Sequence, residues 1–251
     1  MKKIENIAYK NTGHERHLLD IYLPDSEEFS VFVYFHGGGI TAGAKGRTPA
    51  LEYIAKQGIA VVDANYRLYP EAKYPEFIED AASAVAWARE NMGKYGKVKG
   101  IFVGGSSAGG YISQMLCFDK KYLAEVGIDA DEISGYILDA GQPTAHFNVL
   151  KEHGQDSRRV IIDERAPIFY IDDTRKYAPM QIFNAENDID NRYEQTQLLM
   201  GTMKHFGHDM SRVDYRYMEG FRHCRYLKEF PENDCKFADY VAEFINKYEV
   251  K

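Results

Sequence analysis

The sequence predicts a doubly wound α/β fold, in which helices cover both faces of a mostly parallel sheet. The run Val31–Phe35 is apolar at every position, as in a buried central strand. After it, strand-like segments alternate with segments of helical periodicity, the pattern of right-handed crossovers. The chain has 251 residues, of which 45% are hydrophobic and 27% charged. This composition is typical of a large globular domain, so we expect one domain over residues 1–251.

The elements are expected in the following order. Strands are expected at 3–9, 17–23, 31–35, 58–63, 98–103, 133–139, 180–185 and 213–218, and helices at 49–57, 75–91, 109–118, 192–206 and 233–247. The helix at 75–91 has the clearest pattern, because Phe77, Ala81, Ala84 and Ala88 recur at spacings of three and four. Pro75 suits its first turn.

Between residues 141 and 179 the periodicity weakens and charges are mixed. A structureless loop of this length is uncommon inside a compact domain. We therefore expect a small inserted cap at approximately 141–179 that contains some helix.

Charge and composition exclude several classes of function. Lys and Arg number 31 against 38 Asp and Glu, a formal net charge of −7, whereas proteins that bind nucleic acid are more often basic. No apolar run approaches the length of a membrane span, and the first residues lack the apolar region of a secretory signal. Cys117, Cys224 and Cys235 show no metal-ligand spacing and suit a reducing compartment. We expect a cytoplasmic protein with no nucleic-acid partner, no membrane association and no metal.

A GxSxG motif, residues 105–109, follows the strand expected at 98–103 and opens a helix. This context is required for a nucleophile elbow, in which a serine occupies a strained turn that leaves no room for neighbouring side chains. Ser107 is therefore the candidate nucleophile. Ser106 is the adjacent alternative, but it does not have a glycine both two residues before it and two residues after it. A phosphate-binding loop is a further interpretation, although the Lys-Ser or Lys-Thr ending of such loops is missing.

A second glycine-rich segment, His36-Gly-Gly-Gly39, begins where the first central strand ends. Glycine loses more conformational entropy on folding than other residues, so three glycines in a turn with no other role would be destabilising. Backbone amides of Gly38, Gly39 and Ala108 could stabilise the oxyanion of a tetrahedral intermediate. His36 is expected to orient this loop by hydrogen bonding. The alternative is a glycine-rich loop that binds nothing.

A serine nucleophile needs a base, and the base needs an acid that holds its tautomer. Asp188 and His223 follow the strands expected at 180–185 and 213–218, in short loops before a helix. They are the candidate acid and base. For the acid, Asp190, Glu186 and Asp139 are alternatives, and Asp188 could instead cap the next helix.

These segments together resemble the α/β-hydrolase fold, in particular the hormone-sensitive-lipase-like esterases and related bacterial acetyl or feruloyl carbohydrate esterases. The segments that carry the resemblance are residues 36–39, 65–71, 77–80, 105–110 and 219–223. The resemblance implies an oxyanion hole formed by Gly38, Gly39 and Ala108, and a structural role for Asp80 near Tyr66 and Arg67. The region before residue 30 is shorter than the two-helix cap of typical relatives.

The expected activity is that of a carboxylesterase-type serine hydrolase that forms an acyl-enzyme on Ser107. The resemblance favours short acyl esters, including acetyl or feruloyl esters of carbohydrates, as small-molecule substrates. No cofactor is expected. A peptidase or amidase of the same fold and a non-catalytic ligand-binding protein on a hydrolase scaffold are the alternatives. The oligomeric state is left open, with a homodimer as one option.

Overall fold

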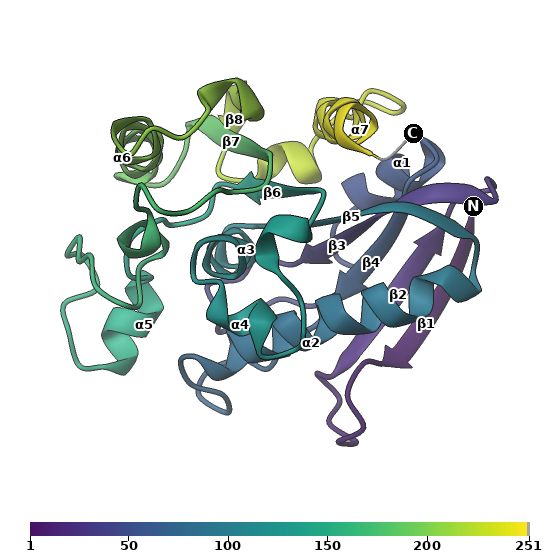
Figure 1. The fold of residues 1–251 in the computed structure, drawn as a ribbon, viewed down its shortest axis with the longest axis horizontal. Helices are drawn as coiled ribbons and strands as arrows, with labels where there is room; N and C mark the ends of the chain where they lie inside the picture. Colours follow the sequence, from purple (N-terminus) through teal and green to yellow (C-terminus); the bar gives the residue numbers. More distant parts are fainter. Residues whose placement is uncertain (250–251) are drawn as a thin grey trace.

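The computed structural model describes residues 1–249 and has one eight-stranded sheet, in the order β1-β2-β4-β3-β5-β6-β7-β8 (Figure 1). The strands are β1 (Lys2–Ala8), β2 (Leu18–Leu23), β3 (Glu28–Phe35), β4 (Ala60–Ala64), β5 (Lys97–Ser106), β6 (Gly135–Asp139), β7 (Met180–Asn187) and β8 (Val213–Arg222). β2 runs antiparallel to β1 and β4, and every other neighbouring pair is parallel. The predicted α/β fold is confirmed.

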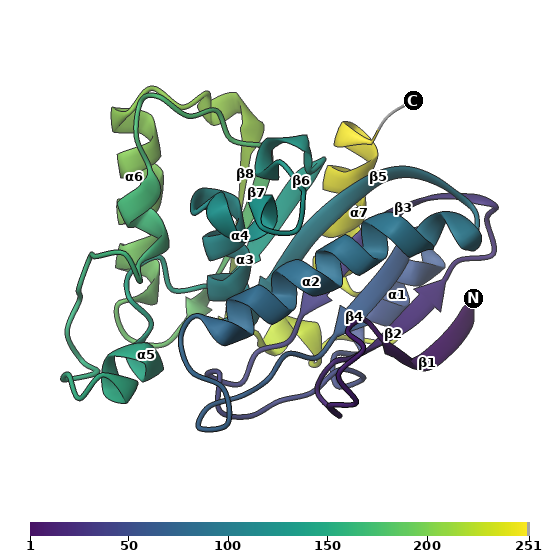
Figure 2. The same cartoon turned by 60° about the horizontal axis from the view of Figure 1, so that its bottom comes forward.

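Helices cover both faces of this sheet (Figures 1 and 2). They are α1 (Ala50–Lys56), α2 (Glu76–Asn91), α3 (Ala108–Phe118), α4 (Lys121–Ala124), α5 (Phe147–Glu152), α6 (Arg192–His205) and α7 (Lys236–Tyr248). Short 3-10 helices lie at 92–94, 130–132, 167–170, 210–212 and 225–227. α1 and α7 pack together on one face, and α2, α3 and α4 lie on the other.

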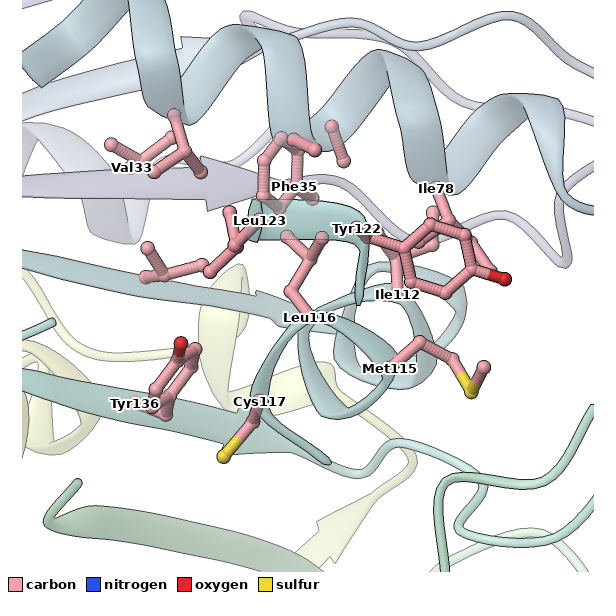
Figure 3. Close-up of a cluster of buried hydrophobic side chains, with 14 of the residues drawn as sticks. Val33, Phe35, Ile78, Ile112, Met115, Leu116, Cys117, Tyr122, Leu123 and Tyr136 are labelled. Atoms are coloured by element: carbon pink, nitrogen blue, oxygen red, sulfur yellow. The ribbon is translucent and has the colours of Figure 1, made fainter. Parts of the chain in front are cut away.

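Side chains of β3 alternate between two hydrophobic clusters, because successive residues of a strand point to opposite faces. Val33 and Phe35 pack with Leu116 of α3 in the cluster of Figure 3. Phe32 and Tyr34 point the other way, toward α1 and α7. All these side chains are buried, so the uninterrupted apolar run of the sequence corresponds to a central strand with two covered faces.

Two predicted boundaries are wrong at the far edge of the sheet. Glu186 and Asn187 belong to β7, and Glu219–Arg222 belongs to β8, where the sequence predicts loops. A register shift follows Ala185, after which Asn187 pairs with Arg222. Most of β8 is only partly buried, so its side chains lack the hydrophobic alternation that marks a strand with one covered face.

The segment 141–179 contains α5 and one 3-10 helix and is otherwise irregular. It packs against the helices beside it: the hydroxyl of Tyr111 donates to the carbonyl oxygen of Arg165 at 2.7 Å, and that of Tyr74 to Glu164 at 2.9 Å. Asn148 Nδ2 donates to the carbonyl oxygen of Gly39 at 2.5 Å. The segment therefore contacts the glycine-rich loop that follows β3.

Candidate active site

Ser107 occupies the turn between β5 and α3 with φ 57° and ψ −113°. A serine at positive φ is uncommon, and surrounding structure must hold it there. A Cβ atom at Gly105 would lie 2.5 Å from the carbonyl oxygen of Phe35, and one at Gly109 would lie 1.9 Å from the same atom. Only glycine fits at these two positions, which explains the spacing of the motif around Ser107.

His223 and Asp188 reach this serine from the ends of β8 and β7. His223 Nε2 lies 2.8 Å from Ser107 Oγ, and Nδ1 forms a short hydrogen bond with Asp188 Oδ1. The geometry fits one tautomer, in which Nδ1–H donates to the carboxylate and Nε2 accepts from the hydroxyl. Ser107 and Asp188, which lie 116 and 35 positions before His223 in the sequence, are thereby joined to it in one chain of hydrogen bonds.

The carboxylate of Asp188 is kept ionised by its surroundings. Its side chain is 3% exposed, and this burial opposes ionisation. Hydrogen bonds from His223 and from the backbone amides of Ile189 and Ala185 outweigh burial and hold the pKa of Asp188 below its ordinary value. An ionised Asp188 fixes the ring of His223 and favours a positive charge on it.

The glycine-rich loop lies directly against the elbow. A Cβ atom at Gly37 would be 3.2 Å from Cβ of Ser107. Gly38 and Gly39 have φ values of 122° and 63°, and a Cβ atom at Gly38 would be 2.1 Å from the carbonyl oxygen of Ala42. Within residues 1–249 the amides of Gly38, Gly39 and Ala108 donate no hydrogen bond. Three backbone donors near Ser107 are thus left for a ligand.

His36 contacts this loop and forms no hydrogen bond with Ser107 in the described part of the chain. Its Nδ1 lies 2.7 Å from the carbonyl oxygen of Gly37, and its ring stacks on Tyr66 at 4.5 Å. Burial lowers the pKa of His36 to about 4, so the ring is neutral near pH 7. A neutral ring donates through Nδ1 and accepts at Nε2, where Arg16 NH2 lies 3.1 Å away. This agrees with the orienting role that the sequence predicts for His36.

Asp80 is hydrogen-bonded to several segments that support the glycine-rich loop at residues 36–39. Its buried carboxylate accepts from Arg67 at 2.8 Å, from Lys10 at 2.7 Å and from His17 at 3.0 Å. Arg16, from the same N-terminal hairpin as Lys10, donates to the carbonyl oxygens of Tyr66 and Gly43, each at 3.0 Å. Sequence reasoning missed this contribution of the N-terminal hairpin, since the contacts join residues 27 to 70 positions apart.

The alternative acids and the alternative nucleophile occupy other positions. Asp139 is fully buried and accepts a short hydrogen bond from Tyr226, not from His223. Ser106 accepts from the hydroxyl of Tyr34 at 3.0 Å. Glu186 accepts from the amide of Gly220 at 2.7 Å, and Asp190 is exposed. None of these four side chains is hydrogen-bonded to His223 in residues 1–249.

Asp139 nevertheless lies under the site. Its carbonyl oxygen accepts from the amide of Ser107 at 2.8 Å, and its carboxylate holds Tyr226 in the turn after His223. Burial raises the pKa of Asp139 to about 6. The one residue therefore touches the segments that carry Ser107 and His223, a connection that no sequence pattern indicates.

A pocket of about 460 Å³ opens over Ser107 and His223. The glycines of residues 37–39 form one wall, and Tyr34, Thr48 and Leu227 contribute to the rest. Among the residues that the structure describes, no cluster of three His, Cys, Asp or Glu side chains could hold a metal ion. No helix in the described part of the chain is long and apolar enough to cross a membrane.

Comparison of this sequence with known proteins identifies several relatives. Residues 19–135 match the family model described as BD-FAE. Esterase LipI of Mycobacterium tuberculosis is 38% identical over 96 residues, which are 37% of this chain and 30% of that protein. The carboxylic ester hydrolase LipN of the same organism is 38% identical over 91 residues, 35% of this chain and 24% of that protein. The chain thus spans about a third or less of the length of these curated relatives.

Solved structures extend the likeness to the whole chain. Esterase B from Lactobacillus rhamnosis superposes with a TM-score of 0.80 at 16% identity, covering 98% of this chain and 85% of that one. The chain has the α/β-hydrolase fold of this esterase. Another hydrolase of this fold, a truncated carbohydrate esterase from gut microbiota, has a TM-score of 0.77 at 19% identity and covers 99% and 96% of the two chains. Esterase 2 of Thermogutta terrifontis, in its propionate-bound form, has a TM-score of 0.75 at 23% identity, with 97% and 93% covered.

Proposed function

We propose that this α/β-hydrolase is a serine carboxylic-ester hydrolase with Ser107 as nucleophile, His223 as general base and Asp188 as the acid that orients it. The observation that carries the proposal is the 2.8 Å contact between Ser107 Oγ and His223 Nε2. Side chains 116 positions apart meet there at the end of a strained turn. The relatives described above are ester hydrolases, which supports the same reaction class.

In the first half of the proposed reaction, Ser107 Oγ attacks the ester carbonyl carbon while its proton passes to His223 Nε2. The carbonyl oxygen becomes an anion, which the amides of Gly38, Gly39 and Ala108 stabilise. When the tetrahedral intermediate collapses, the C–O bond to the alcohol breaks and His223 returns the proton to the leaving oxygen. The acyl group remains on Ser107.

In the second half, water attacks the acyl-enzyme as His223 takes a proton from it. The same three amides stabilise the second oxyanion. Collapse breaks the bond to Ser107 Oγ, which recovers its proton from His223, and the carboxylic acid leaves. Both halves balance without a cofactor.

The substrate class is part of the proposal. A pocket of about 460 Å³ lies in the lower part of the range for small-molecule sites, roughly 300–1,000 Å³, and suits a short acyl chain. Acetyl esters, including those of carbohydrates, fit this size, and feruloyl esters are the larger members of the proposed range. A relative 25% identical over 96% of this chain and 82% of its own length is named a versiconal hemiacetal acetate esterase, from Aspergillus parasiticus. We further infer that residues 141–179 act as a small cap on a single domain, because Asn148 contacts Gly39.

The deciding experiment is hydrolysis of p-nitrophenyl acetate by the wild-type protein and by Ser107→Ala. We expect the variant to lose about 10⁴- to 10⁶-fold in kcat with an unchanged circular dichroism spectrum, since nucleophile and base act as a unit. Ser106→Ala is the matched control, and its loss should be far smaller. Equal turnover by Ser107→Ala and wild type would reject the proposal.

A second measurement identifies the serine directly. A phosphonate that mimics the tetrahedral intermediate should label one residue, and peptide mass spectrometry should place the adduct on Ser107. p-Nitroacetanilide tests the amidase alternative. Cleavage of this anilide at a rate comparable to that of the acetate would replace the esterase assignment with an amidase.

A further inference from the structure

Three cationic side chains line the pocket above Ser107: Arg47, Arg225 and Lys228. No aspartate or glutamate is among the lining residues. The chain as a whole has a formal net charge of −7, so this concentration of positive charge runs against its overall balance. A cleft lined by one sign of charge attracts molecules of the opposite sign.

Arg47 lies on the loop between β3 and α1, whose backbone is fixed on both sides of it. The amide of Gly46 donates to Asp63 at 2.6 Å, and that of Lys45 donates to Asn65 at 2.8 Å. Thr48 is buried, with its hydroxyl oxygen 3.5 Å from that of Tyr34. The side chain of Arg47 is exposed and forms no hydrogen bond or ion pair with residues 1–249. The loop thus holds its position while leaving the guanidinium group available.

Arg225 and Lys228 lie in the turn that follows His223. Tyr226 and Leu227 anchor this turn, being 1% and 3% exposed, and the hydroxyl of Tyr226 bonds to Asp139. Arg225 forms an exposed ion pair with Glu229 at 2.9 Å. Lys228 is exposed and has no ionic partner among the residues described. Two of the three cations are therefore not neutralised within this part of the chain.

The position of these cations relative to the base indicates which part of the substrate they meet. In the proposed reaction His223 delivers its proton to the leaving oxygen, so the alcohol portion lies beside His223. The turn that begins one residue later carries Arg225 and Lys228. The acyl portion is joined to the same carbon on the side away from the leaving oxygen.

We propose that the site prefers esters whose alcohol portion carries an anionic group, such as a carboxylate, which Arg47, Arg225 and Lys228 bind at the mouth of the pocket. This inference rests on the proposed esterase function and narrows its substrate class. Arginine and lysine are the residues that bind carboxylates through charge-assisted hydrogen bonds.

The test compares two acetyl esters that differ only in the charge on the alcohol portion, 4-acetoxybenzoate and 4-acetoxybenzamide. We expect wild-type kcat/KM to be about 10-fold higher for the anionic ester at low salt, and the ratio to fall toward one at about 0.5 M salt, where exposed charges are screened. The double substitution Arg47→Gln and Lys228→Gln should lower that ratio about 5- to 10-fold. Lys204→Gln, an exposed lysine of α6 outside the pocket lining, is the control and should keep the wild-type ratio.

Glu229→Gln sharpens the test in the opposite direction. It removes the partner of Arg225, so the ratio should rise about 2-fold, in keeping with the small energy of an exposed ion pair. A third substrate pair, p-nitrophenyl hydrogen succinate and p-nitrophenyl pentanoate, places the negative charge on the acyl portion. The proposal expects no comparable preference within this pair.

Several outcomes would overturn the inference while leaving the esterase function intact. These are hydrolysis of both acetoxy esters with equal kcat/KM, a preference that the double substitution leaves unchanged, and a preference that appears only with the succinate. Failure to hydrolyse p-nitrophenyl acetate, together with absence of phosphonate labelling at Ser107, would reject the esterase function and this inference with it.

Discussion

The turn at Ser107 opens a fully buried helix, whereas the ends of β7 and β8, which lead to Asp188 and His223, are mostly exposed. Every residue of α3, which begins at Ala108, is buried, and glycines on either side of Ser107 have backbone within 3 Å of where a Cβ would lie. In β8 only Met218 is buried. The candidate site therefore joins a tightly packed half, which holds Ser107 and the glycine-rich loop, to an exposed half, in which hydrogen bonds position Asp188 and His223.

The comparison teaches that the two halves tolerate different changes. In the packed half, geometry is enforced by lack of space, so added atoms should disturb structure and activity together. At the edge, geometry is enforced by specific hydrogen bonds such as those to Asp188. There, loss of one polar atom should remove activity while the fold remains.

After Ser107→Ala, the largest expected effect is at the exposed ends of β7 and β8. Asp188→Asn should lower kcat by about 10⁴-fold, because the amide stabilises the wrong tautomer of His223 without changing the shape of the site. Steady-state hydrolysis of p-nitrophenyl acetate measures the loss, and thermal unfolding monitors the fold. Asp190→Asn is the matched control, with near wild-type turnover expected. If the effects of the two substitutions were reversed, Asp190 would replace Asp188 as the acid.

In the packed half, Gly38→Ala should lower kcat by about 10²- to 10³-fold, the cost of losing an oxyanion donor. The new Cβ would lie 2.1 Å from the carbonyl oxygen of Ala42, so the loop must move. KM for p-nitrophenyl acetate should change much less than kcat. An unchanged kcat would assign the loop a purely structural role.

Substitutions at two further glycines test the effect of packing on stability. Gly109→Ala places a Cβ 1.9 Å from the carbonyl oxygen of Phe35 and should destabilise the protein by about 3 kcal/mol or more. Gly201→Ala, within α6, meets nothing within 4 Å and should stabilise it by about 0.5–1 kcal/mol. Urea unfolding of both variants measures the difference. Equal stabilities would contradict the contrast between the two halves.

The smallest effect concerns the pH dependence of stability at Asp139. Burial raises its pKa from 3.8 to about 6, so the folded protein binds this proton more tightly than the unfolded chain. The contribution of this proton to the free energy of unfolding is fully present below pH 3.8 and is lost as the pH rises to about 6. Asp139→Asn should flatten the stability profile over this interval. Unfolding at a series of pH values, with Asp190→Asn as reference, tests it, and a variant profile that still falls with the wild-type slope would exclude Asp139 as the source.

The sequence predicts most of the fold because its central strands are buried on both faces. Runs such as that of β3 and the periodicity of α2 reflect burial directly, so composition and spacing indicate them. For the opposite reason, the sequence predicts loops at the ends of β7 and β8, where the structure has strands. Most of their residues are exposed, and hydrogen bonds between backbones do not restrict the type of side chain.

The candidate site divides in the same way. Local motifs indicate Ser107 and the glycines after β3, because strain and close approach restrict those positions to particular residue types. The positions of Asp188 and His223 after two strands indicate them as candidates, and hydrogen bonds link them to Ser107 in the structure. The supports contributed by Arg16, Asp139 and Tyr226 depend on contacts between distant segments, and no spacing within one segment predicts those.

The order of the chain gives the candidate site a further property. Ser107 is in place once the central strands and α3 have assembled, but His223 arrives only with β8, beyond nearly nine-tenths of the sequence. The rate at which ester hydrolysis returns during refolding would therefore report the rate at which β8 joins the sheet. A nascent or truncated chain that ends before β8 would contain the candidate nucleophile without the candidate base.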